Sequence, residues 1–331
     1  MSAAGEITPT AAIPLNAPPQ IRERVASGRI SWTGPLLLVS ARPLLLVASQ
    51  AIVALILFAA HRRTPWRAAG DWWNVYGTVV DVSCLIGLRY FTRKEGIRFR
   101  DLIGQIRLRH GHDLFLGLGF FVAIFPFFMG GSYLARRVLY SSPHQDPNAY
   151  LLHGHALPIW AIVYSMTLWW VIWSPTEETT YQAYALPRLE ALTGRTWVAF
   201  LIVGFFWTAQ HCALPFVPNW RYLLFRFITF LPGVLLLILF YLRTRRVAPL
   251  IVAHWPHGHC GSPDDRYLLA SSFYTMTCVA TILTVSPGCL RTQRRGRSRH
   301  ASKPGAELSC DQNVQNFFQV LDISDKWPSS A

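Results

Sequence analysis

Charged residues are scarce in this sequence. Only 15% of its 331 residues are Asp, Glu, Lys or Arg, whereas 52% are hydrophobic. Because a soluble domain carries about 25% charged residues, this composition excludes an ordinary soluble globular protein. The hydrophobic residues also lie in long blocks, which is typical of segments that cross a membrane.

Several motifs are missing as well. The six cysteines form no CxxC pair, which excludes a disulfide framework and a zinc knuckle, and the metalloprotease motif HExxH does not occur. The first thirty residues are rich in Ala and Pro and contain no apolar segment of the kind that a cleavable signal peptide requires. We therefore predict that residues 1–34 form a disordered cytoplasmic leader.

The net charge of +14 comes almost entirely from arginine, since Lys94, Lys303 and Lys326 are the only lysines. The cations stand in short clusters between apolar blocks, for example at 62–63 and 243–246. Arginines at helix ends that face anionic lipid explain this distribution better than a nucleic-acid surface does. We therefore expect a lipid bilayer and no nucleic acid as a partner. The Arg bias also points to a bacterial genome, and so to a bacterial plasma membrane.

Apolar blocks of about 17–21 residues recur along the chain, close to the length that a hydrocarbon core of about 30 Å demands. They lie near 43–60, 74–91, 114–131, 158–174, 196–213 and 222–242, with a seventh from Val247 through His254 and a weaker one at 267–285. The predicted fold is an all-α integral membrane protein with about seven or eight transmembrane helices in one bundle.

The chain divides into four predicted parts. The leader is followed by N-terminal transmembrane helices at 35–157, with an interfacial amphipathic helix near 97–109. A second transmembrane core spans 158–259, and an atypical basic and polar segment spans 260–331. The leader and the loop 89–113 hold about ten Lys and Arg residues, against about five in the alternate loops, so we expect both on the cytoplasmic side.

Two adjacent carboxylates, Glu177 and Glu178, stand beside an apolar block. Carboxylates are costly in a membrane and usually face a bundle interior or a water-filled cavity. The sequence SPTE at 174–177 favours a helix start, with Ser174 as N-cap and Glu177 at the capping-box position. In the simplest alternative, Glu177 only caps this helix and Glu178 meets water. Gln182 lies four residues after Glu178, on the same helix face.

Two histidines follow apolar runs, His211 at the end of FFWTAQH and His254 at the end of PLIVAH. A lone buried His is more often a packing residue than a catalyst, and His257 and His259 match no standard zinc spacing with His254. If a helix runs from 174 to 193 and the next ones return, both histidines converge with the carboxylates near the cytoplasmic face. The predicted polar cavity therefore opens to that side.

This set of side chains is suited to hydrolysis. A carboxylate and an imidazole that face one water molecule provide a general base, and a second imidazole stabilises an oxyanion. Alternatively, Glu177, His211 and His254 hold a zinc ion that activates the water. The sequence does not separate these mechanisms, so zinc stays open as a cofactor.

The order of these motifs resembles the CAAX prenyl protease and bacteriocin-processing family of intramembrane proteases. Its pattern is EExxxR on one helix, FxxxH on the next, and a final His followed four residues later by Asn or Asp. Here EETTYQAYALPRLEALTGR (177–195), FFWTAQH (205–211) and PLIVAH (249–254) resemble the three pieces in order and with similar gaps. The resemblance covers about 158–256 and makes 158–259 a protease-like core.

The resemblance implies a role for each matching residue. Glu177 activates the water with His211 as its partner, Glu178 is the supporting carboxylate, and His254 orients or stabilises the oxyanion. Supporting positions are Gln182, which replaces the motif Arg but keeps a hydrogen-bond donor for Glu178, and Trp207, a larger ring in the packing place of Phe. The motif Asn or Asp is replaced by Gly258, which has no side chain.

We therefore expect an intramembrane endopeptidase that hydrolyses a prenylated or membrane-associated peptide or protein. The alternative is a catalytically dead family member that acts as a membrane binding or immunity protein, which Gly258 favours. A transporter that uses the same side chains as a proton relay is a third hypothesis, weakened by the lack of an internal repeat.

Overall fold

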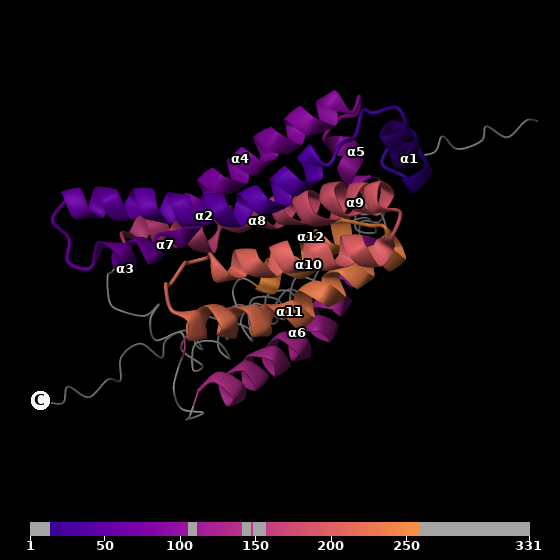
Figure 1. The fold of residues 1–331 in the computed structure, drawn as a ribbon. Coiled ribbons are helices and arrows are strands. Elements are labelled where there is room, and N and C mark those ends of the chain that lie inside the picture. The colour runs from indigo at the N-terminus through magenta and orange to yellow at the C-terminus, as the bar shows by residue number, and fades with distance from the viewer. Residues whose placement is uncertain (1–13, 105–110, 141–146, 148–156, 258–331) are drawn as a thin grey trace, which may run out of the picture. The chain divides into compact units, whose positions relative to one another are not determined.

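Figure 1 shows the computed structural model of the chain. The structure describes residues 14–104, 111–140, 147 and 157–257, all within Met1–Thr275, the first of two units into which the chain divides. The weak apolar segment predicted at 267–285 and the predicted segment 260–331 lie outside the described residues.

Every regular element in the described ranges is a helix. The first half holds α1 (Pro18–Ala26), α2 (Thr33–Ala59), α3 (Pro65–Gly70), α4 (Trp73–Lys94), α5 (Arg100–Ile103) and α6 (His112–Leu139). The second half holds α7 (Ile159–Met166), α8 (Leu168–Glu178), the π-helix η3 (Thr179–Ala185), α9 (Leu186–Thr193), α10 (Thr196–Cys212), α11 (Trp220–Thr244) and α12 (Ala248–His257). The predicted all-α class is confirmed for this part of the chain.

Three of these helices, α2, α6 and α11, are long and apolar enough to cross a membrane, and α10 is a shorter apolar helix of 17 residues. Large apolar side chains such as Leu55, Val138 and Leu201 point outward from the bundle. Lipid tails accommodate an outer surface of this kind, whereas water does not. The chain is therefore a multi-pass membrane protein.

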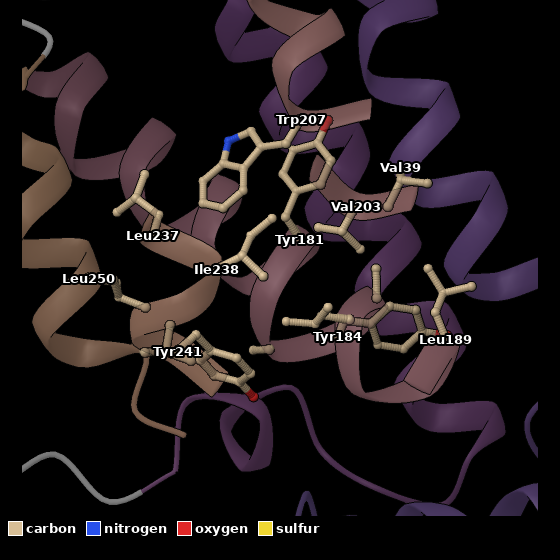
Figure 2. Close-up of a cluster of buried hydrophobic side chains, with 14 of the residues drawn as sticks. Val39, Tyr181, Tyr184, Leu189, Val203, Trp207, Leu237, Ile238, Tyr241 and Leu250 are labelled. Atoms are coloured by element: carbon tan, nitrogen blue, oxygen red, sulfur yellow. The ribbon is translucent and has the colours of Figure 1, made fainter. Parts of the chain in front are cut away.

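The bundle has a buried centre to which α2, η3, α9, α10, α11 and α12 contribute. Figure 2 shows Tyr181, Trp207 and Ile238 in this cluster, from three of these elements. Helix α6 packs along α11 and α12 (Figure 1). Small residues allow this close approach, since a Cβ atom on Gly131 would lie 2.7 Å from the Thr229 carbonyl oxygen.

The predicted helix start at Ser174 is wrong. Helix α8 begins at Leu168, after a break at Thr167, and the backbone stays helical through η3 and α9 as far as Thr193. The Ser174 hydroxyl donates to the Ile251 carbonyl oxygen on α12 at 2.9 Å, instead of capping its own helix. Residues 158–174 and 175–193 are therefore not two separate crossings. They form the short helix α7 and one longer run.

Hydroxyl groups donate to the backbone around a proline inside this run. Pro175 lies within α8. The hydroxyls of Thr176, Thr179 and Thr180 donate to carbonyl oxygens four residues earlier, at 2.6 to 2.7 Å. These hydroxyls add hydrogen bonds to the backbone around the proline, which itself has no N–H to donate.

Part of the predicted disordered leader is folded. Helix α1 lies within it, and Ile21 of this helix is fully buried. Asn16 Nδ2 donates to the Ala183 carbonyl oxygen at 2.9 Å, which attaches the segment to η3. The prediction of disorder is wrong here because these contacts outweigh the Ala- and Pro-rich composition. Residues 1–13 lie outside the described ranges.

In the range 97–109, where an interfacial helix is predicted, the structure has the four-residue helix α5, and the interfacial location stays a prediction. Gly104 follows with a φ of 73°, a left-handed conformation that suits glycine and ends the helix. Residues 105–110 are not among those described.

A buried ion pair joins three parts of the fold. Arg188 of α9 is fully buried, and its Nη2 lies 2.6 Å from Oε2 of Glu95, which follows α4. Arg188 Nε also donates to Glu95 at 2.9 Å, and Arg188 Nη1 donates to Asn16 Oδ1 at 3.0 Å. The pair therefore attaches α4 and the segment before α1 to α9.

We predict that Glu95→Ala lowers the free energy of unfolding by about 3–5 kcal/mol, because it leaves the Arg188 guanidinium buried without a counter-charge. The matched control is Glu190→Ala, which removes a partly exposed ion pair with Arg245 and is expected to cost less than about 1 kcal/mol. Reversible unfolding of the purified protein in detergent measures both changes. Equal losses would contradict the structural role of the buried pair.

Candidate active site

Three helices bring Glu177, His211 and His254 together. Glu177 lies near the end of α8, His211 in the last turn of α10, and His254 in α12. His211 Nε2 is 3.7 Å from Glu177 Oε1, and His254 Nε2 is 3.8 Å from Glu177 Oε2. All three are buried. The two imidazoles thus face the two oxygens of one carboxylate at distances longer than a direct hydrogen bond.

Glu177 uses its two oxygens differently. Oε1 accepts hydrogen bonds from Trp207 Nε1 and from Gln210 Nε2, both on α10. Oε2 is buried and has no hydrogen-bond partner within the described part of the chain. Oε1 therefore anchors the carboxylate, and the lone pairs of Oε2 remain for a proton.

Glu178 holds His254. His254 Nδ1 lies 2.7 Å from Glu178 Oε1, and the Trp173 ring packs edge-on against the imidazole, with an interplanar angle of 71° and 4.5 Å between the ring centroids. With the proton on Nδ1, the imidazole donates to the carboxylate, and this bond directs Nε2 toward Glu177. Both glutamates are fully buried, so the alternative in which Glu177 caps a helix and Glu178 meets water is wrong.

His211 is held from α11. Its ring stacks on Phe230 with a centroid distance of 4.1 Å and an interplanar angle of 7°. The Arg226 guanidinium lies over the same Phe230 ring and donates to the carbonyl oxygens of His211 (3.0 Å) and Leu214 (2.9 Å). A cation there satisfies carbonyl groups at the end of α10. The imidazole and its backbone are thus fixed together.

The two predicted supporting residues, Trp207 and Gln182, make contacts that differ in part from the predicted ones. Trp207 packs as expected, with its ring stacked on Tyr181 (5.2 Å, 8°; Figure 2), but its indole N–H also donates to Glu177. The predicted hydrogen bond from Gln182 to Glu178 is wrong. Neither side-chain polar atom of Gln182 has a hydrogen-bond partner among the residues described, because Glu178 turns to His254 instead.

Gly258 and His259 lie outside the described residues, as does the side chain of His257. Nothing in the structure therefore tests the motif position after His254.

Gln210 was not among the predicted site residues, although it precedes His211 directly. Two isolated charges in apolar helices were also missed. Arg42 of α2 contacts Gln210, and Asp81 of α4 pairs with Arg42. A single charge inside an apolar run is itself a signal of a buried polar function, and this signal was available in the sequence.

The structure does not identify a zinc site. Within the residues that the structure describes, no group of three or more His, Cys, Asp or Glu side chains is placed to hold a metal ion. A metalloprotease site is therefore not supported.

Residues 158–257 match a family model. The family is described as Type II CAAX prenyl endopeptidase Rce1-like. This match confirms the resemblance that the motifs indicate, and it includes both glutamates and both histidines. The match covers less than one third of the chain. It ends one residue before Gly258, which stands where the motif has Asn or Asp. No curated protein matches the chain, and no solved structure does.

We predict that Trp207→Phe lowers the free energy of unfolding by about 1.5–3 kcal/mol more than Trp169→Phe does. Both changes keep a buried aromatic ring, but only Trp207 donates to a charged group. The indole N–H of Trp169 has no hydrogen-bond partner within the described ranges, which makes it the matched control. Equal losses in an unfolding titration would show that the Trp207 N–H does not anchor Glu177.

Proposed function

We propose that this protein is an intramembrane endopeptidase that hydrolyses a peptide bond in a prenylated or membrane-associated peptide or protein. The observation that carries the proposal is the buried Glu177 carboxylate, with Oε1 anchored, Oε2 without a partner among the described residues, and two imidazoles facing it. The match of residues 158–257 to a prenyl endopeptidase family supports the same reaction.

In the proposed reaction, Glu177 acts as the general base. Oε2 accepts a proton from a water molecule whose oxygen attacks the scissile carbonyl carbon. His211, which faces the same carboxylate, orients this water. When the tetrahedral intermediate collapses, Glu177 returns the proton to the leaving amine, and the peptide bond breaks.

His254 stabilises the oxyanion of the tetrahedral intermediate. Its Nε2 faces Glu177 Oε2 at 3.8 Å, so a carbonyl carbon attacked there carries its oxygen within reach of the imidazole. Glu178 stabilises an imidazolium that donates a hydrogen bond, as a buried carboxylate does for a catalytic histidine. The two glutamates therefore have separate roles, one on the water and one on His254.

The surroundings favour an apolar substrate. Trp169, Trp170 and Trp173 form a buried aromatic cluster, and the Trp173 ring contacts His254. Aromatic faces next to the reacting groups accept a lipid chain or large apolar side chains. We therefore place the substrate class among peptides that carry a lipid or lie in the membrane.

We further propose seven or eight crossings of a bacterial plasma membrane, with the site open to the cytoplasmic side. The arginines before α2 and after α4 support a cytoplasmic location of that end. A cysteine introduced into the leader would contradict this orientation if an impermeant reagent labelled it in intact cells.

The alternative, a catalytically dead family member that binds a partner or confers immunity, rests on Gly258, outside the described residues. The arrangement around Glu177 favours the enzyme.

We predict that the purified protein cleaves members of a panel of prenylated and unmodified peptides, and that Glu177→Gln reduces the rate by about 10²–10⁴-fold. Glutamine keeps the size of the side chain but is no base. The matched control, Glu190→Gln, changes a carboxylate outside the site and should leave cleavage intact. Mass spectrometry identifies the products. Equal cleavage by the parent and Glu177→Gln would exclude Glu177 as the base.

A single turnover in H₂¹⁸O separates a general base from a nucleophile. Direct attack by water places ¹⁸O in the new carboxyl group of the product and none in Glu177, which is the result we expect. Attack by Glu177 itself would expel the amine and form a mixed anhydride, whose hydrolysis at the Glu177 carbonyl carbon puts ¹⁸O into this carboxylate during the first turnover. Peptide mass mapping of the enzyme and of the product reads both positions.

A further inference from the structure

A buried arginine contacts the site from a helix outside the family match. Arg42 of α2 is only 2% exposed, and its Nη2 lies 2.6 Å from Asp81 Oδ1 on α4. Arg42 Nε donates to the side-chain oxygen of Gln210 at 2.6 Å, across 168 residues of sequence. Gln210 in turn donates to Glu177. A charge on α2 is therefore linked to the carboxylate through one amide group.

The amide of Gln210 has a defined orientation because of Arg42. An arginine side chain has only donors, so it requires the amide oxygen on its side. The Tyr181 hydroxyl donates to the same oxygen at 3.0 Å. The NH₂ group must then face Glu177 Oε1 as a donor. If the amide were reversed, its oxygen would face the carboxylate and repel it.

The residue at the expected place cannot provide a charge. Gln182 stands where the motif carries Arg, it is neutral, and its side chain has no hydrogen-bond partner within the described ranges. The cation that is linked to Glu177, through Gln210, comes instead from Arg42 on a different helix.

We propose that Arg42 is a positioning residue, which fixes the Gln210 amide so that it anchors Glu177 Oε1 and leaves Oε2 for the water. This inference rests on the proposed hydrolysis and adds to it a part of the chain outside residues 158–257. Arg42 does not touch the reacting atoms, and Asp81 holds Arg42 in place.

A purely structural role for Arg42 makes a different prediction. If the arginine serves only to neutralise Asp81, the double variant Arg42→Met/Asp81→Asn removes both charges and restores whatever Arg42→Met loses. If Arg42 positions Gln210, the double variant regains stability but not turnover, because the amide is still free to rotate.

The experiment compares the parent, Arg42→Lys, Arg42→Met and Arg42→Met/Asp81→Asn in full-length protein, with kcat and KM measured on a peptide that the parent cleaves. We expect the double variant to lose about 100-fold in kcat, as displacement of a reacting group does, with KM within about threefold of the parent. Lysine keeps a charged donor and should recover part of kcat. Parent-like turnover by the double variant would overturn the proposal.

Gln210→Leu provides the matching variant. If Arg42 acts through Gln210, adding Gln210→Leu to the double variant lowers kcat little further, since both changes remove the same anchor. Independent, multiplying losses would contradict the link. If one of the Arg42 variants fails to fold, kcat of Gln210→Leu is compared with kcat of Gln210→Leu/Arg42→Lys instead. This pair also tests whether the effect of Arg42 depends on Gln210.

A second readout needs no turnover and so separates this inference from the proposed function. Dicyclohexylcarbodiimide, a membrane-permeant reagent, modifies carboxyl groups that carry a proton. Because the Arg42 cation stabilises a negative charge on Glu177, we expect labelling of Glu177 to be at least about tenfold faster in Arg42→Met/Asp81→Asn than in the parent. Tandem mass spectrometry separates Glu177 from Glu178. Unchanged labelling would overturn the proposal even if no peptide is cleaved.

Discussion

Burial of the Glu177 carboxylate is the constraint on which the rest of the structure depends. An ionised carboxylate in an apolar bundle is expensive unless hydrogen-bond donors and charges surround it. Here α10 provides two N–H donors, and histidines of α10 and α12 face the same group. The positions of the surrounding helices therefore all bear on this one side chain. Its two oxygens differ because both N–H donors come from α10 and reach Oε1.

The outer helices contribute to the same constraint. Arg42 on α2 and Asp81 on α4 extend the polar network beyond residues 158–257, and Phe230 on α11 fixes His211. A site assembled from so many helices needs the whole bundle, because no single helix provides all of its polar groups. The continuous run from α8 to α9, with its π-helical turn, places the two glutamates on the interior side.

The order of motifs was sufficient to predict that four polar residues at or near the ends of apolar blocks converge, namely Glu177, Glu178, His211 and His254. The sequence could not show that Ser174 lies inside a helix. Its local sequence has the signals of a helix cap, but its hydroxyl donates to Ile251, 77 residues away. The link between Arg42 and Gln210 was missed for the same reason. Contacts between distant segments leave no spacing pattern in the sequence.

The most direct test of the account is a structure of the protein with a bound peptide phosphinate, whose tetrahedral phosphorus mimics the hydrolytic intermediate. The account predicts one phosphinate oxygen within hydrogen-bond distance of Glu177 Oε2 and the other within hydrogen-bond distance of His254 Nε2, while Trp207 and Gln210 still donate to Oε1. A phosphinate bound away from Glu177, or contacting Oε1 after displacing those two donors, would contradict the central role assigned to this carboxylate.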